Sequence, residues 1–414
     1  MTTSENTIIF SNARLLADVD VGPVDGMHVM ISGGKVAAIS ERPIEKLDAH
    51  VVDLNGRTLM PGLIDCHVHV VAVVAKMAEN ALLPDATVAL HSANILRGML
   101  DRGFTTVRDM GGASFELAEC VSDGTVAGPR IVICGKALSQ TGGHGDARAR
   151  IEERDFSYQG GRLGSLGRVA DGVDACRAAV RDEIRRGAHF VKVMANGGVV
   201  SIFDPMENLG YSDEELRAIV EEAKNANTYV AGHLYTDRAI RRALECGVHS
   251  VEHANLVEPD TARMMADRQA FACPTLVLFG KLRTEGPRMA LPQVVLDRIE
   301  RVWERGLRSL EILREAGVQM AYGTDLLGPM HPYQSEEFSI RGSVIPARDV
   351  IRSATSAAAK LLRMEGELGT IRPGAIADLI VVDGDPLLDV ELLAKGGERL
   401  PIIVKGGQFH KNTL

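Results

Sequence analysis

The middle of the chain alternates between short apolar runs rich in β-branched residues and longer segments whose apolar positions recur at helical spacing. Eight of the apolar runs predict β-strands. They span residues 63–70, 105–110, 130–135, 190–195, 229–235, 250–255, 271–276 and 320–325. Because helical patterns lie between most of them, the strands are expected to be parallel, and eight is the number that closes a (β/α)8 barrel.

Two of the predicted helices have clear end signals. Ser212 is a favourable N-cap, and Glu215 three residues later completes a capping box ahead of an apolar helical repeat. A second helix is predicted over residues 294–316, where Gly317 suits the C-terminal cap. Two connections, residues 139–171 and 196–211, are long, and in a barrel such loops lie over the face where active sites form.

The two ends of the chain have a different pattern, in which short β-rich runs are separated by turn signals. These runs are residues 8–10, 27–31, 36–39 and 51–54, and then 377–382, 401–404 and 408–410. Strand-rich ends around a different middle predict a small β-sandwich domain built from both termini. The expected fold is therefore α/β: residues 1–60 and 366–414 form the composite β domain, and residues 61–365 form a (β/α)8 TIM barrel.

Composition then narrows the classes of function. The 414 residues include 46 Lys and Arg against 55 Asp and Glu, a net charge of -9. This balance argues against a dedicated partner for nucleic acid or for an anionic membrane. No apolar segment is long enough for a membrane helix, and the first residues lack the pattern of a signal peptide, so the cytoplasm is the expected location.

Five candidate metal ligands fall at the ends of predicted strands. His67 and His69 end the first strand, and the two-residue period of a strand places both imidazoles on one face. His233, His253 and Asp325 end the fifth, sixth and eighth strands. The carboxyl ends of barrel strands meet at one face, and this ligand set suits Zn²⁺ or a similar divalent ion. The alternative, unrelated buried histidines each satisfied by hydrogen bonds, would require that they fall at matching strand ends by coincidence.

Lys192 is a sixth candidate, because it interrupts an otherwise apolar strand and alternation turns it away from Val191 and Val193. An ammonium buried beside metal ions would be repelled and costly to desolvate. Loss of its proton and reaction with carbon dioxide would give an anionic carbamate that can bridge two metals. The alternative is a lysine that reaches solvent or pairs with an acid.

These residues resemble the metal-dependent amidohydrolase superfamily over essentially the whole chain. The resemblance rests on residues 61–69 (PGLIDCHVH), Lys192, His233, His253, residues 323–325 (GTD) and the closing stretch 369–379 (GTIRPGAIADL). Within the superfamily the chain is most similar to the binuclear Xaa-Pro dipeptidase (prolidase) group and to ochratoxin-hydrolysing amidohydrolases. The stretches that support this are 139–146 (SQTGGHGD), 233–235 (HLY), 323–328 (GTDLLG) and 334–338 (QSEEF).

The resemblance implies a role for each candidate. His67, His69 and Asp325 would hold one divalent ion, most simply Zn²⁺, His233 and His253 would hold the second, and carboxylated Lys192 would bridge them. A hydroxide shared by the two ions would attack an amide, with Asp325 carrying its proton to the leaving nitrogen. His144 would steady the oxyanion, and Tyr235 would bind a carboxylate on the leaving-group side. A cation should assist Tyr235, and the connection 139–171 offers Arg148 as well as Arg150, Arg162 and Arg168.

The expected substrates are therefore small molecules with a free carboxylate, such as Xaa-Pro and other dipeptides and N-acyl amino acids. The alternative is a xenobiotic amide, carbamate or urea such as ochratoxin A. A ring aminohydrolase is less favoured because Lys192 is present, and a catalytically dead scaffold because every metal ligand is intact. The resemblance also implies a homo-oligomer, with an octamer as one form. Ala254 departs from the glycine usual in the family, and Leu234 from the usual alanine.

Overall fold

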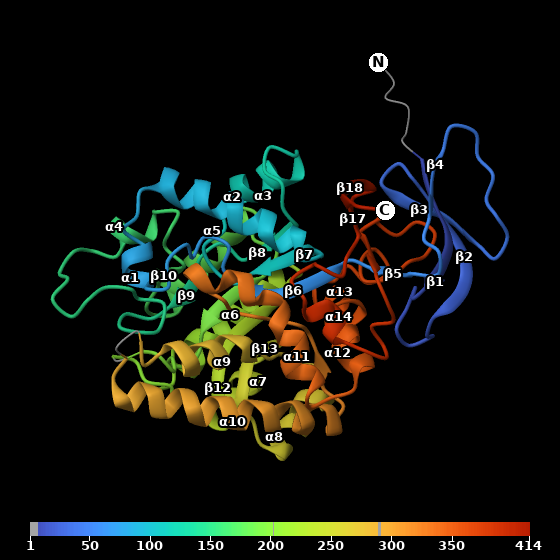
Figure 1. The fold of residues 1–414 in the computed structure, drawn as a ribbon. Helices are drawn as coiled ribbons and strands as arrows, with labels where there is room; N and C mark the ends of the chain where they lie inside the picture. Colours follow the sequence, from blue (N-terminus) through green and yellow to red (C-terminus); the bar gives the residue numbers. More distant parts are fainter. Residues whose placement is uncertain (1–6, 202, 289–290) are drawn as a thin grey trace.

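The computed structural model describes residues 7–201, 203–288 and 291–414. Parallel strands from the middle of the chain lie among surrounding helices, and strands from both ends form a separate sheet to one side of them (Figure 1). The C-terminus lies beside this terminal sheet. None of the helices in the described part of the chain combines the length and apolar character needed to cross a bilayer.

The parallel strands form two sheets. One pairs β6 (Leu63–Val68), β7 (Phe104–Asp109) and β8 (Arg130–Ile133). The other has the order β10 (Gly167–Val169), β9 (Ala137–Ser139), β11 (Val191–Met194), β12 (Val230–Thr236), β13 (Ser250–Leu256), β14 (Phe271–Cys273) and β15 (Gln319–Met320). A strand overlaps each of the eight predicted runs, but the eighth run, 320–325, overlaps β15 only at Met320, and residues 321–325 are not in a strand. The additional strands β9 and β10 have only three residues each, too few to show an alternating pattern.

Backbone hydrogen bonds join the first parallel strand to the segment after the last. The N–H of Cys66 donates to the carbonyl oxygen of Tyr322 at 2.7 Å, and the N–H of Asp325 donates to the carbonyl oxygen of His67 at 2.8 Å. No continuous ladder connects the two sheets within the described residues. The α/β architecture is thus confirmed, and closure into a single barrel stays a prediction.

The helices that cover these strands follow the predicted end signals. The Ser212 side chain accepts from the N–H of Glu215, whose carboxylate in turn accepts from the N–H of Ser212, so the capping box is confirmed. Gly317 has φ +74°, the left-handed conformation expected just beyond a helix end. The helices are α1 (Met77–Asn80), α2 (Asp85–Asp101), α3 (Phe115–Ser122), α4 (Ser157–Gly160), α5 (Val173–Arg185), α6 (Asp213–Asn225), α7 (Asp237–Cys246), α8 (Pro259–Asp267), α9 (Leu276–Glu285), α10 (Gln293–Glu315), η1 (Gly328–Ser335), α11 (Glu336–Gly342), α12 (Ala347–Ser353), α13 (Ser356–Leu361) and α14 (Glu391–Ala394).

The terminal sheet joins strands that are far apart in sequence. Its order is β18 (Gln408–Asn412), β17 (Ile402–Lys405), β16 (Leu379–Val382), β5 (Thr58–Pro61), β1 (Ile8–Leu15), β2 (Val24–Ser32) and β3 (Lys35–Ser40), and β4 (His50–Asp53) also pairs with β1. Its buried apolar cluster includes Phe10, Val29 and Leu379. A terminal β-sheet made from both ends is confirmed, and its division into two facing layers stays a prediction. The pattern missed β5, whose four residues are all buried and therefore do not alternate.

Candidate metal centre and substrate cavity

The ends of β6 and the segment after β15 bring two histidines to one carboxylate oxygen. The Nε2 atoms of His67 and His69 lie 3.3 and 3.2 Å from Oδ1 of Asp325. Nδ1 of His69 lies 3.1 Å from the carbonyl oxygen of Gly111, and Nδ1 of His67 lies 2.8 Å from a carboxylate oxygen of Glu252. Both partners accept hydrogen bonds, so Nδ1 carries the proton in each ring and Nε2 keeps a lone pair when the ring is neutral. Lone pairs that face a carboxylate repel it unless a cation, either a proton on the ring or a metal ion, lies between them.

The second pair of histidines has an unsatisfied buried atom. His253 Nε2 lies 2.9 Å from His233 Nδ1, and His253 Nδ1 lies 2.8 Å from the Thr275 hydroxyl. His233 Nε2 is buried and has no hydrogen-bond partner among the described residues. Burial lowers the pKa of both histidines well below the ordinary value, which keeps them neutral as metal ligands must be. The orphaned nitrogen and the donor set therefore fit a bound divalent ion.

Asp325 lies close to the histidines from both pairs. His67, His253 and Asp325 each offer a ligand atom, and these atoms all lie within 4.8 Å of one another. Burial would raise the pKa of Asp325, but the adjacent His67 and His69 lower it well below its ordinary value. The carboxylate is therefore ionised, as a ligand or proton acceptor requires.

The backbone is strained where these ligands sit. His253 has φ 73°, Ala254 has φ 54° and Asp325 has φ 57°, all in the left-handed region that side chains other than glycine rarely adopt. Such conformations persist only where the surrounding structure enforces them, and they gather at functional sites. The observation also explains why the resembling family often has glycine at the position of Ala254.

Lys192 lies where alternation along β11 predicts, buried at the wall of the same cavity as the histidines. Burial lowers its pKa, although Glu252 and Asp325 oppose the shift. A lowered pKa favours the neutral amine, the form that can react with carbon dioxide.

A buried ion pair behind His67 was not identified from the sequence. Glu252 accepts from Arg108 at 2.8 Å and from the Ser250 hydroxyl at 2.5 Å, and its other oxygen contacts His67. Burial would raise the pKa of Glu252, but Arg108 and His67 lower it. Arg108 and Glu252 are fully buried, on β7 and β13. The sequence did contain a signal for this pair: Arg108 and Glu252 are charged residues within two predicted strands that are otherwise largely apolar.

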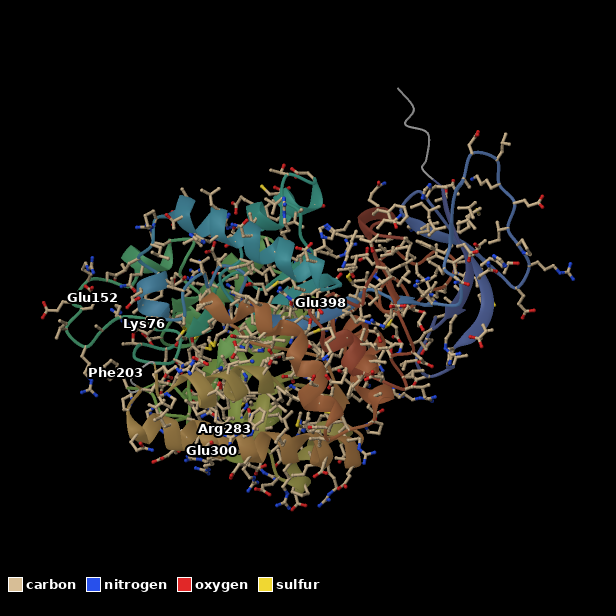
Figure 2. All side chains as sticks on the ribbon, viewed as in Figure 1. Lys76, Glu152, Phe203, Arg283, Glu300 and Glu398 are labelled. Carbon is tan, nitrogen blue, oxygen red and sulfur yellow. The ribbon has the colours of Figure 1, made fainter. Side chains whose placement is uncertain are left out.

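The metal-ligand candidates open into a cavity of about 710 Å³. Most of its wall is apolar and includes Met77, Met194, Phe279 and Met330. Lys76, Glu152 and Phe203 also line it, and they lie at the end of the molecule away from the terminal sheet (Figure 2). The long connections after β9 and β11 thus border the cavity, as loops over an active-site face are expected to do.

His144 and Tyr235, the two residues expected to face the substrate, both line this cavity. The His144 ring stacks on that of His233 with centroids 4.3 Å apart, and burial lowers its pKa to about 4. Tyr235 stacks on His253 at 4.6 Å. Asn196 Oδ1 accepts from the N–H of Tyr235 at 2.8 Å, which ties the end of β12 to the connection after β11.

The candidate arginines are placed differently from one another. Arg148 lines the cavity with its guanidinium already paired to both oxygens of Asp146, at 2.9 and 2.7 Å. Arg150 also lines the cavity, 4.4 Å above the Phe203 ring. Arg162 pairs with Asp85, and Arg168 pairs with Asp182 and Glu183.

Gln334, the first residue of the stretch 334–338 (QSEEF), does not line the cavity. The amide of Gln334 donates to Asp65 at 2.9 Å and accepts from the Arg102 guanidinium at 3.0 and 3.1 Å. Its part in the fold is thus to connect buried charges behind the candidate metal centre.

Comparison with known proteins shows similarity over almost the whole chain. A model of the amidohydrolase family matches residues 58–408. The ochratoxinase of Aspergillus niger is 32% identical over 434 aligned positions, which cover 99% of this chain and 88% of that protein. Two solved structures are similar over almost all of both chains: a prolidase complexed with N-methylphosphonate-L-proline (45% identity, TM-score 0.96, 99% and 100% covered) and a Xaa-Pro dipeptidase with bound methionine (28%, 0.86, 98% and 100%).

Proposed function

The chain belongs to the amidohydrolase family and is an enzyme acting on carbon–nitrogen bonds, and on this premise we propose that it cleaves amides that carry a free carboxylate on the nitrogen side. The proposed substrates are Xaa-Pro and other dipeptides and N-acyl amino acids. The observation that carries the proposal is the convergence of His67, His69 and Asp325, with the orphaned nitrogen of His233, on one large apolar cavity.

Two divalent ions, taken as Zn²⁺, would be held by His67, His69 and Asp325 and by His233 and His253, with carboxylated Lys192 between them. When bound, such ions lower the pKa of water toward neutrality and polarise the amide carbonyl. The fully buried Arg108–Glu252 pair fixes the orientation of His67. We also propose that the two parallel sheets belong to one (β/α)8 barrel, which the Cys66–Tyr322 hydrogen bond supports.

Three residues and one arginine would act directly on the substrate. The Asp325 carboxylate accepts a proton from the attacking water and delivers it to the leaving nitrogen. His144 donates a hydrogen bond to the carbonyl oxygen as negative charge develops on it. Tyr235 donates one hydrogen bond to the substrate carboxylate, and Arg148 or Arg150 supplies the positive charge that a phenol lacks.

The wall of the cavity supports an apolar acyl group. Three methionines and two phenylalanines line it, and unbranched Met side chains adapt to different apolar shapes. The same wall, together with the 32% identical ochratoxinase, supports a second candidate: a bulky xenobiotic amide such as ochratoxin A, whose amide also adjoins a carboxylate.

A panel of dipeptides, N-acyl amino acids and ochratoxin A, assayed with the zinc-loaded protein, tests the proposal and separates the two candidates. Each substrate is paired with its carboxamide. A charge-assisted hydrogen bond contributes roughly 1.5–3 kcal/mol, so amidating the carboxylate should lower kcat/KM about 10- to 150-fold. Tyr235→Phe should weaken cleavage of the acid and leave the carboxamide nearly unchanged. Equal cleavage of the two forms by the wild type would refute carboxylate recognition, and neutral carbamates or ureas would become the better candidates.

Arg148→Ala and Arg150→Ala, measured on the same pairs, identify the cation. The arginine that binds the carboxylate should lose the preference for the acid over the carboxamide when it is replaced. If neither variant loses the preference, no arginine of the connection 139–171 that lines the cavity serves this role.

A further inference from the structure

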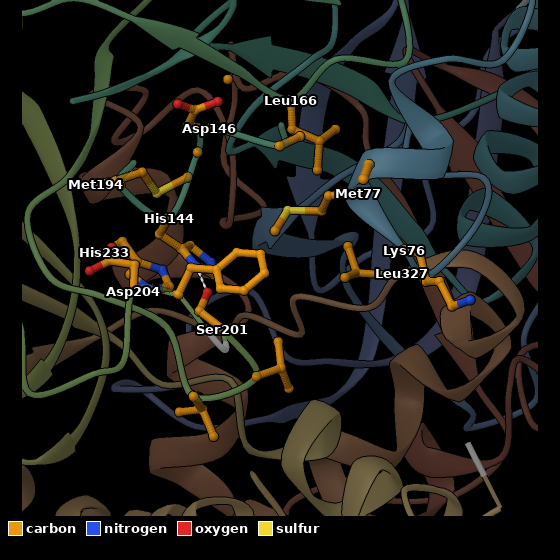
Figure 3. Close-up of a pocket in the computed structure, with 18 of the residues that line it drawn as sticks. Lys76, Met77, His144, Asp146, Leu166, Met194, Ser201, Asp204, His233 and Leu327 are labelled. Atoms are coloured by element: carbon orange, nitrogen blue, oxygen red, sulfur yellow. Dashed lines mark hydrogen bonds between the residues drawn. The ribbon is translucent and has the colours of Figure 1, made fainter. Parts of the chain in front are cut away.

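The two long connections over the cavity meet at a hydrogen bond that none of the assigned roles uses. His144 belongs to the connection after β9, and Ser201 belongs to the connection after β11. His144 Nδ1 lies 2.8 Å from the Ser201 hydroxyl (Figure 3). The His144 ring also stacks on the His233 ring, and the two ring planes are inclined by only 20°. Stacking fixes the plane of the His144 ring, and the hydrogen bond fixes its rotation within that plane.

The backbone around Ser201 is shaped to bring its hydroxyl to this ring. A Cβ atom at Gly198 would lie 2.3 Å from His144 Nδ1 and 2.8 Å from the Ser201 oxygen, so a side chain at that position would displace the ring or the hydroxyl. The Ser201 N–H donates to the Gly198 carbonyl at 3.3 Å, and the Ser201 carbonyl accepts from Arg298 of α10 at 3.2 Å. The position of the serine is thus set from both sides.

We propose that Ser201 is the positioning residue for His144: its hydroxyl donates to Nδ1 and so places the ring proton on Nε2. This inference rests on the proposed function. A serine hydroxyl can either donate or accept, and a neutral imidazole has one N–H. Only the tautomer with Nε2–H leaves a donor on the nitrogen that does not face Ser201. The opposite tautomer would direct a lone pair at a developing oxyanion and repel it.

The kinetic test compares wild type, Ser201→Ala, His144→Ala and the double variant, with the best-cleaved member of the panel above. Loss of one hydrogen bond should lower kcat about 2- to 12-fold and leave KM nearly unchanged. In the His144→Ala background, Ser201→Ala should have no further effect on kcat, because there is no ring left to orient. A serine that only braces the loop would lower kcat by the same factor in both backgrounds, and that result would overturn the proposal.

Ser309→Ala is a matched control. Ser309 lies in α10, where its buried hydroxyl donates to the carbonyl oxygen of Gly306 at 2.8 Å. Its replacement also removes one hydrogen bond of a serine hydroxyl, here to a backbone carbonyl and not to an imidazole, and it should leave kcat at the wild-type value. An equal fall in kcat in Ser309→Ala would mean that general destabilisation, not ring orientation, explains the effect.

A second measurement does not depend on activity. Nitrogen-15 NMR of histidine-labelled, zinc-loaded protein, with the His144 signals assigned from His144→Gln, should show the Nε2–H tautomer in the wild type and a mixture in Ser201→Ala. A dominant Nδ1–H tautomer in the wild type would overturn the proposal. If the protein cleaves no member of the panel, the proposed function fails, whereas the tautomer still decides the role of Ser201.

Discussion

Glu252→Gln should separate the two tasks of the buried pair behind His67. The substitution keeps the shape of the side chain but leaves the fully buried Arg108 guanidinium without its counter-charge. Removing one partner of a buried ion pair typically lowers the free energy of unfolding by about 3–5 kcal/mol. The variant also replaces the acceptor of the His67 Nδ1 proton, and loss of such a ligand-orienting contact typically lowers metal affinity about 10- to 100-fold. Urea titration of the metal-free protein measures the first effect, and competition with a chromogenic chelator measures the second.

Glu337→Gln is the matched control for this experiment. Glu337 and Arg341 form another fully buried pair, with Arg341 Nε 2.8 Å from a Glu337 oxygen, and none of the candidate metal ligands hydrogen-bonds to Glu337 among the described residues. This variant should also unfold at lower urea concentration and should bind zinc as the wild type does. If Glu252→Gln loses stability but keeps wild-type zinc affinity, the reasoning that Glu252 orients His67 is wrong.

Three further predictions concern the bridge, the pH dependence and the terminal sheet. Lys192→Ala should lower the metal content from two ions per chain to one or none and abolish most activity; elemental analysis that finds two ions and full activity would refute the bridging role. Lys136 donates to the carbonyl oxygens of Arg162 and Ser165, and burial lowers its pKa to about 8. Between pH 8 and about 10.5, Lys136 keeps its proton in the unfolded chain but has lost it in the folded chain. The free energy of unfolding of the wild type should therefore rise with pH by up to about 3 kcal/mol relative to that of Lys136→Met. Parallel pH profiles of the unfolding free energy in the two proteins would contradict this. A chain that ends at Glu365 lacks β16, which pairs with β5, and should be insoluble because a sheet edge and apolar faces are exposed; a soluble, active chain would show that the terminal sheet is dispensable.

Hydrophobic periodicity was sufficient for most of the parallel strands and for the best-capped helices. The residues around Ser212 specify a helix start locally, since the hydroxyl and the Glu215 carboxylate each satisfy an N–H of the same turn. The strand that carries Lys192 was equally easy to predict, because its one charged residue lies among buried apolar neighbours. In both cases the information lies within a few residues, which is the range over which a pattern can be read.

The short strands β9 and β10 and the contact between His144 and Ser201 could not be read in this way. Three-residue strands are stabilised by pairing with neighbours that the sequence does not identify. His144 and Ser201 are separated by 57 positions, and each lies in a long connection; the path of the second depends on Gly198 and on a distant donor, Arg298. Side chains at cavity walls are therefore predictable as candidates, whereas the partners that orient them depend on how the loops fold back.

The charges buried beneath the site show why these orienting partners are functional as well as structural. An isolated carboxylate at the position of Glu252 would become protonated, because burial raises its pKa; Arg108 and His67 keep it ionised. An ionised Glu252 fixes the His67 proton on Nδ1 and leaves Nε2 toward Asp325. The next residue, His253, contacts His233 of the second ligand pair, so a shift of this part of β13 would disturb both halves of the centre at once. Substitutions at Arg108 should therefore reduce the binding of both proposed ions rather than one.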